Sequence, residues 1–333
     1  KCHHHPNEKW SQDDFYQLAA HFGPVKQKGA GLSPPISAGT ETFYFSPGGT
    51  VKHPVSGTVM TPRPPDGPEL GESPGDPRRA LADWLTRPEN PFFAPAAVNR
   101  VWASFFGRGL VHPVDDFRTS NPCVNPELLA ALARDFAANG YDLKHLMRTL
   151  LESRTYQLST EPNDTNLADT RQFSRSYRRR LPAEVLMDAV RDVTGVPDTF
   201  AALPAGGRAM QVWSYKVESH FLDAFGRPNS SSDCPCERDL QLSVVQSLHL
   251  MNSRSVQAKL SDPQGRVRRL AAGHQPPEDV VREAYLTTLN RDPSPRELES
   301  AVASFTAEGA TRETATEDVF WALLNSPEFI LNH

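Results

Sequence analysis

Apolar side chains recur at helical spacing along most of this chain, from Pro77 onward. In the first such stretch, Leu81, Trp84 and Leu85 lie three or four residues apart, so a helix of 3.6 residues per turn would place them on one face. The pattern predicts a mainly α fold, with a multi-helix bundle-like domain. The predicted helices cover residues 12–22, 77–87, 95–106, 126–138, 142–153, 182–194, 239–259, 265–272, 277–289, 294–307 and 312–324.

Proline is concentrated at the other end of the chain, where 18 of the 30 prolines lie in the first 126 residues. This bias predicts long proline-rich loops, including an extended strap over residues 61–77. Residues 42–46 and 51–54 flank the turn signal Pro47-Gly48-Gly49 and are predicted to pair as a small N-terminal β-hairpin. A further strand is predicted within residues 208–216.

Length and charge exclude two classes of protein. The chain has 333 residues, of which 38% are hydrophobic, so it can bury a core. Its net charge of -5 argues against a protein that binds nucleic acid through bulk positive charge. No apolar run approaches the roughly 18 residues that a membrane-spanning helix requires. We therefore expect no nucleic-acid partner and no membrane span in this fragment.

Several long motifs are spread over the chain. They are Asn99-Arg100-Val101-Trp102, Asp115-Asp116-Phe117-Arg118, Arg179-Arg180-Leu181-Pro182-Ala183-Glu184, Cys234-Pro235-Cys236-Glu237-Arg238 and Leu324-Asn325-Ser326-Pro327-Glu328-Phe329. Together they resemble the signature of planctomycete cytochrome-associated proteins. The resemblance implies a C-terminal domain of unknown function (PSD type) over residues 74–333, and the tail of a PSCyt-type domain over residues 1–73.

The same resemblance implies a compartment and a context. Planctomycete cytochrome-associated proteins of this kind are extracytoplasmic, so we expect a periplasmic or extracellular location. We also expect this chain to be a fragment whose upstream part, including any signal peptide, is missing. The expected partner is an electron-transfer protein or a cell-surface component.

Sulfur and imidazole groups gather in two segments. The opening residues Cys2 and His3 resemble the end of a Cys-x-x-Cys-His motif, which attaches haem c through two thioether bonds. The first cysteine of that motif would precede Lys1, so haem c is expected only in the intact parent protein. A disulfide between Cys234 and Cys236 would be strained, so this pair suits metal chelation or redox exchange better.

The two segments define a candidate metal site if the fold brings them together. Its ligands would be Cys2, His3, His5, Cys234 and Cys236, a sulfur and nitrogen set that suits zinc. Two simpler readings stay open. The histidines are exposed polar residues near a chain end, or the cysteines are thiols of an irregular loop that cross-link elsewhere.

Charged residues of the motifs form a second candidate cluster. Asp115 and Asp116 could serve acid–base chemistry or bind calcium, but such pairs more often bind nearby arginines. We predict that Trp102 and Phe105 pack inward while Arg100 points to the acidic turn. The run from Arg178 to Arg180 is predicted to be a solvated or salt-bridged face. The predicted structural polar network comprises Asn99, Arg100, Arg108, Asp115, Asp116, Arg118, Glu184 and Arg238.

The sequence leaves three functions open and assigns no enzymatic reaction. The first is an extracytoplasmic module with redox- or metal-linked binding. The second is a hydrolase or accessory protein that acts on extracellular polysaccharide. The third is a metal-free interaction scaffold.

Overall fold

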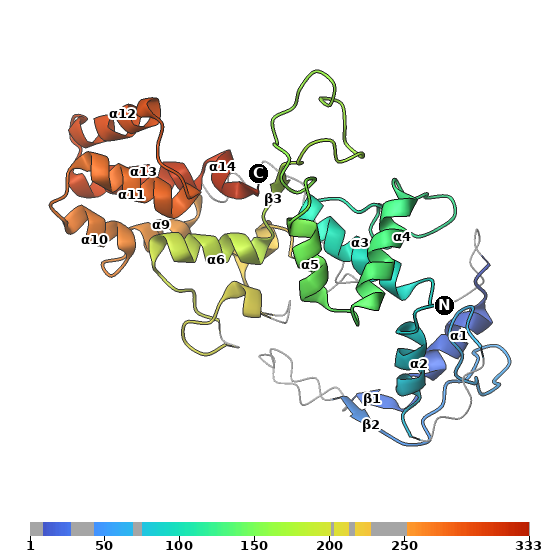
Figure 1. Cartoon of the computed structure of the whole chain (residues 1–333). Coiled ribbons are helices and arrows are strands. Elements are labelled where there is room, and N and C mark those ends of the chain that lie inside the picture. Colours follow the sequence, from blue (N-terminus) through green and yellow to red (C-terminus); the bar gives the residue numbers. More distant parts are fainter. Residues whose placement is uncertain are drawn as a thin grey trace. The chain divides into compact units, whose positions relative to one another are not determined.

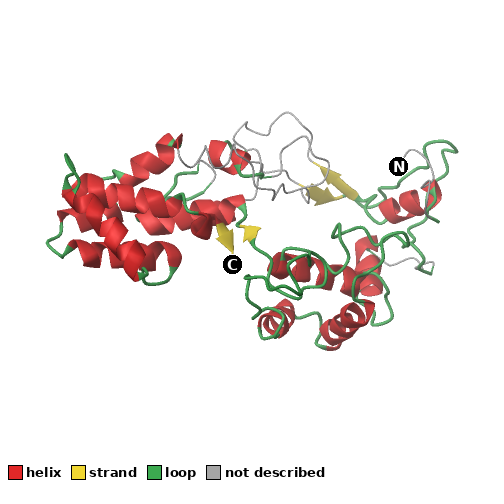
Figure 2. Ribbon diagram, turned by 90° about the horizontal axis from the view of Figure 1, so that it is seen from above, coloured by secondary structure: helices red, strands yellow, loops and turns green. Residues whose placement is uncertain are grey.

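The structure, a computed structural model, describes residues 9–27, 43–68, 75–200, 203–212, 217–227 and 252–332. Helices dominate this part of the chain (Figures 1 and 2), which confirms the predicted mainly α class. The chain divides into two compact units. Unit 1 comprises residues 1–32 and 41–177, and unit 2 comprises residues 33–40 and 178–333. The predicted boundary between residues 73 and 74 stays a prediction.

The described helices of unit 1 are α1 (Gln12–Ala20), α2 (Pro77–Leu85), α3 (Phe93–Phe106), α4 (Pro126–Ala138) and α5 (Leu143–Leu151). All of them except α3 begin at a side-chain cap. The side chain of Asn125 accepts a hydrogen bond from the amide of Leu128 and so caps α4. Gly107 has φ 76°, in the left-handed region, and ends α3 through a hydrogen bond to Ala103 O.

The core of unit 1 lies among α3, α4 and α5. Trp102 is 3% exposed and stacks on Phe106, with ring centroids 4.0 Å apart. Phe173, from the loop after α5, packs edge-on against Trp102 at 5.2 Å. The predicted inward packing of Trp102 is confirmed, whereas Phe105 is only partly buried at the edge of this core.

The N-terminal hairpin is present, but its strands differ from the predicted ones. β2 (Phe43–Phe45) pairs antiparallel with β1 (Val25–Gln27), and the predicted pairing of β2 with residues 51–54 is wrong. The reason is a close backbone approach: a Cβ on Gly49 would lie 2.4 Å from Gly23 O. Glycines therefore let the turn after β2 lie against the chain that leads into β1, where Ser46 N donates to Pro24 O at 2.8 Å.

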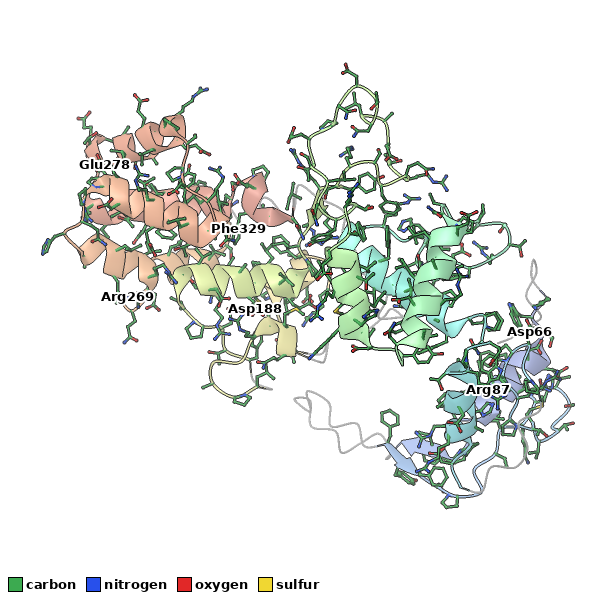
Figure 3. All side chains as sticks on the ribbon, viewed as in Figure 1. Asp66, Arg87, Asp188, Arg269, Glu278 and Phe329 are labelled. Carbon is green, nitrogen blue, oxygen red and sulfur yellow. The ribbon has the colours of Figure 1, made fainter. Side chains whose placement is uncertain are left out.

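Unit 2 contains the remaining described helices. They are α6 (Ala183–Thr194), α7 (His220–Ala224), α9 (Arg254–Leu260), α10 (Arg266–Ala272), α11 (Pro277–Leu289), α12 (Pro295–Ala303), α13 (Arg312–Leu324) and α14 (Pro327–Ile330). α13 packs against α9, α10, α11 and α14 and supplies the fully buried Phe320 and Leu324. Phe329 of α14 completes this core (Figure 3).

Strands are minor elements of unit 2. β3 (Arg179–Arg180) pairs antiparallel with β4 (Leu331–Asn332), and the sequence predicted neither strand. The strand predicted within residues 208–216 is wrong for residues 209–211, because Ala209–Gln211 form a 3-10 helix (η1). Residues 213–216 lie outside the described residues. A second 3-10 turn, η2 (Ser304–Thr306), follows α12.

Candidate functional site

The predicted metal ligands are not placed by the structure. Cys2, His3, His5, Cys234 and Cys236, together with Arg238 of the predicted polar network, lie outside the described residues. Their convergence on one site stays a prediction. Within the described ranges, no group of three or more His, Cys, Asp or Glu side chains is arranged to hold a metal ion.

The motif around Asn99 forms a buried latch between α3 and the loop that follows it. Asn99 is 0% exposed. Its Nδ2 donates to Val111 O and to Val114 O, both at 2.8 Å, and its Oδ1 accepts from Val111 N at 3.0 Å. A Cβ on Gly109 would lie 2.9 Å from the Asn99 amide and 2.2 Å from Val111 O. A side chain at position 109 would overlap the Asn99 amide and the Val111 carbonyl, so glycine is required for these hydrogen bonds to form.

The acidic turn binds arginines, as predicted. The Arg100 guanidinium lies 2.6 Å from the Asp115 carboxylate, and Arg118 Nη2 lies 2.5 Å from Asp116 Oδ2. The hydrogen bond from Arg118 lowers the pKa of Asp116. The Arg100 and Asp115 side chains are 52% and 53% exposed, so water screens their attraction and the pair adds little stability.

Three further N–H or thiol groups of unit 1 lie near this motif in the sequence. The Trp102 indole N–H and the Arg108 Nε are buried and have no hydrogen-bond partner among the described residues. Arg108 is therefore not shown to join the predicted network. Cys123 is a free, half-buried cysteine, and burial raises the pKa of its thiol. A raised thiol pKa lowers the fraction of reactive thiolate.

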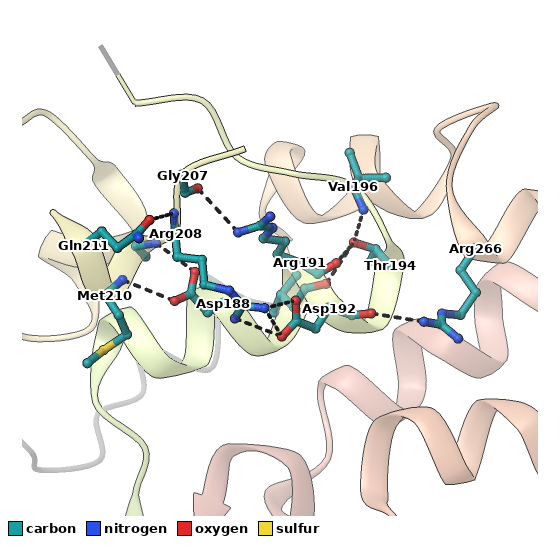
Figure 4. A network of polar contacts seen from close by, with 12 residues as sticks. Asp188, Arg191, Asp192, Thr194, Val196, Gly207, Arg208, Met210, Gln211 and Arg266 are labelled. Carbon is teal, nitrogen blue, oxygen red and sulfur yellow. Dashed lines mark hydrogen bonds and ion pairs between the residues drawn. The ribbon is translucent and has the colours of Figure 1, made fainter. Parts of the chain in front are cut away.

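In unit 2 a row of carboxylates follows one side of α6. Glu184, Asp188 and Asp192 are spaced by four residues, and the first two are 7% and 5% exposed. Asp188 Oδ1 accepts from Ala209 N at 2.8 Å and Oδ2 accepts from Met210 N at 3.2 Å (Figure 4). The buried carboxylate thus satisfies the amides at the start of η1, which explains why residues 209–211 form a helical turn.

The exposed end of the same row holds the neighbouring loop. Asp192 accepts two-pronged hydrogen bonds from Arg208 at 2.9–3.1 Å, and Arg191 donates to Gly207 O at 3.4 Å (Figure 4). Both contacts join α6 to the segment that leads into η1. Asp188 and Asp192 of this row therefore hold the segment before η1 against α6.

The run from Arg178 to Arg180 was predicted to be a solvated or salt-bridged face, and Arg180 is not solvated. It is 3% exposed, its Nη2 donates to Phe225 O at 2.8 Å, and its guanidinium lies 5.6 Å from the Phe225 ring. Burying a guanidinium is tolerated because hydrogen bonds and the ring face replace its water. The strand pairing of β3 with β4 places this side chain inside unit 2, which charge alone did not predict.

A two-carboxylate clamp in unit 2 was missed by sequence reasoning. Arg291 donates two-pronged hydrogen bonds to Glu297 at 2.8–2.9 Å and to Glu328 at 2.6–2.8 Å. The hydrogen bond from Arg291 lowers the pKa of Glu297 to about 2. The sequence feature that could have indicated the two carboxylates is a pair of Ser-Pro helix starts, at Ser294 and Ser326. Each is followed by a glutamate in the first turn of its helix.

Two hollows flank α13 in unit 2. The larger, about 480 Å³, lies among α11, α12 and α13, and the smaller, about 330 Å³, lies between α9 and α13. Asp318 lines both. Small-molecule sites commonly have volumes of about 300–1,000 Å³, and both hollows fall within this range. Glu297, which binds Arg291, lines the larger hollow, whereas Asn99, the acidic turn and Asp188 line neither.

These observations define a mainly helical protein of two units in which polar motif residues tie loops to helices. The chain belongs to the family PSD1, described as protein of unknown function (DUF1553), which matches residues 77–305 and so more than half of its length. No curated protein and no solved structure matches the chain. None of the described helices is both long and apolar enough to cross a membrane.

Proposed function

We propose that this chain is an extracytoplasmic binding module of the planctomycete cytochrome-associated type, with a role linked to redox chemistry or to a metal. Its location would be the periplasm or the cell exterior, and its partner an electron-transfer or cell-surface protein. The support comes from the motifs quoted above and from the residue types at the two cysteine-containing segments. The membership in PSD1 agrees with the domain type but adds no activity.

One observation carries the preference for binding over catalysis: the described motif carboxylates are engaged in structural ties. Asp115 and Asp116 bind arginines, and Asp188 caps η1. Each described carboxyl group with a clearly displaced pKa has it displaced downward. A general acid that works near neutral pH needs a raised pKa instead. Asp116 and Glu297, which bind arginines, therefore lack this property.

The donor chemistry of the cysteine and histidine segments supports a metal. Thiolate sulfur and neutral imidazole nitrogen are the usual ligands of structural zinc. Cys2, His3, His5, Cys234 and Cys236 would supply that set in this chain. In the intact parent, a complete Cys-x-x-Cys-His motif would hold haem c, which supplies one-electron transfer when bound.

The test is the metal content and visible spectrum of two proteins, this chain and the intact parent. Zinc is measured by mass spectrometry before and after chelation, and haem by its absorbance. The double variant Cys234→Ser/Cys236→Ser should lose zinc, whereas the control Cys123→Ser should retain it, because Cys123 packs at the core of unit 1. If both proteins lack zinc and haem, the metal-linked proposal is wrong and the metal-free scaffold is favoured.

A further inference from the structure

Helix α5 carries one broad apolar face, and only part of it belongs to the core. Leu146 and Leu150 are 0% and 1% exposed and pack inside unit 1. Leu143, Met147 and Leu151 are 49%, 36% and 38% exposed. A helix whose apolar surface is wider than its core contact usually has a second partner.

The exposed residues have the geometry of a docking stripe. Leu143, Met147 and Leu151 are spaced by four residues, so they follow one another along the helix over about 12 Å. Lys144 and Arg148 each follow a stripe residue by one position, or about 100° of rotation, and therefore border the stripe along one edge. We call these five residues the α5 face.

The charged border of the α5 face forms no ion pair with the described carboxylates. Lys144 and Arg148 are exposed. Backbone hydrogen bonds from His145 and Lys144 lower the pKa of Asp142 at the start of α5, and the positive charge of Lys144 contributes to this shift. The nearest titratable residue of α5 outside the face, His145, instead contacts Asp135 of α4 at 2.8 Å. Two exposed cations beside an apolar stripe complement a partner that offers apolar side chains bordered by carboxylates.

We propose that the α5 face docks an amphipathic helix of another protein, whose apolar stripe is bordered by Asp or Glu. A membrane surface fits less well, because the α5 face has three aliphatic residues and no aromatic anchor. A second copy of the chain also fits less well. Two copies paired antiparallel about Met147 would bring their Arg148 side chains together, where like charges repel.

The experiment uses the full chain and two synthetic helical peptides. Both peptides carry leucines at every fourth position, and the residues that border the leucines are glutamates in one and lysines in the other. Binding is measured by fluorescence anisotropy of the labelled peptides. The glutamate peptide should bind, and the lysine peptide should bind at least about tenfold more weakly because like charges repel.

Variants of the α5 face sharpen the test. Met147→Glu should weaken the binding of the glutamate peptide by about tenfold or more. Arg148→Glu should reverse the preference, so that the lysine peptide binds more tightly than the glutamate peptide. Leu167→Glu is the matched control, because Leu167 is 66% exposed in unit 1 but lies outside the face. Circular dichroism checks that each variant is folded. Should Met147→Glu be unstable, the exposed Arg148→Glu still decides.

Three outcomes overturn the proposal. The first is no binding of the glutamate peptide or equal binding of both peptides. The second is tighter binding to vesicles of phosphatidylcholine and phosphatidylglycerol, reduced by Arg148→Glu, which indicates a membrane surface instead. The third is self-association of the chain, measured by analytical ultracentrifugation, that is abolished by Met147→Glu. This outcome would assign the α5 face to a second copy of the chain.

Discussion

Replacing Asn99 with alanine is the most direct test of the latch between α3 and its following loop. The substitution removes three hydrogen bonds, two from Nδ2 to Val111 O and Val114 O and one from Val111 N to Oδ1. Val111 is 3% exposed, so water cannot readily replace the lost partners. A typical net hydrogen bond contributes about 1 kcal/mol, and an unsatisfied buried donor costs about 1–3 kcal/mol. The expected loss of unfolding free energy is therefore about 3 kcal/mol.

The neighbouring residue provides the control. Arg100→Ala removes the half-exposed ion pair with Asp115, whose loss should cost less than about 1 kcal/mol. Asn99→Asp keeps the volume and the acceptor but places a carboxylate oxygen against two carbonyl oxygens. It should therefore destabilise the latch as strongly as alanine does. The comparison separates hydrogen bonding from the loss of side-chain volume.

The assay is native-state hydrogen exchange at the Val111 amide, which donates directly to Asn99. A loss of about 3 kcal/mol corresponds to exchange faster by about 100-fold. Urea unfolding, followed separately for the two units, should show the loss in unit 1 only. If Asn99→Ala exchanges at Val111 no faster than Arg100→Ala, the latch does not hold the loop and the reasoning fails.

Three further predictions concern other ties. Asp188→Ala should destabilise unit 2 by about 1–3 kcal/mol in thermal unfolding, because two buried amides of η1 lose their acceptor; an unchanged melting temperature contradicts this. His21 is 1% exposed, and burial lowers its pKa from the ordinary value of 6.5. The free energy of unfolding should therefore fall as the pH drops below about 6.5, because the unfolded chain binds the proton more readily than the folded chain. His21→Gln should lack this pH dependence, and its absence in the unchanged protein would contradict the prediction. Arg291→Met removes the partner that depresses the pKa of Glu297. The variant should therefore lose the contribution to the stability of unit 2 that is present above about pH 4.5 and disappears toward pH 2. An unchanged midpoint of acid unfolding refutes this.

Local signals in the sequence determined most of the helices. α4 begins and ends at the predicted residues 126 and 138, and α13 at residues 312 and 324. Such boundaries depend on a cap and on apolar spacing within one stretch of chain, as at Asn125 before Pro126. For the same reason the link between Arg100 and the acidic turn was predictable, since the partners lie only 15 residues apart.

Tertiary structure decided what depends on partners distant in the chain or on burial. The pairing of β2 with β1, the burial of Arg180 against Phe225, and the joining of Arg291 to Glu328 each connect residues that no local pattern relates. Burial also separates neighbours of the same motif: Asn99 is fully enclosed, whereas Arg100 is half exposed. A sequence records which groups can donate, accept or pack, but only the folded chain sets how much water each one loses. That loss of water determines which polar contact stabilises a unit and which merely lies on its surface.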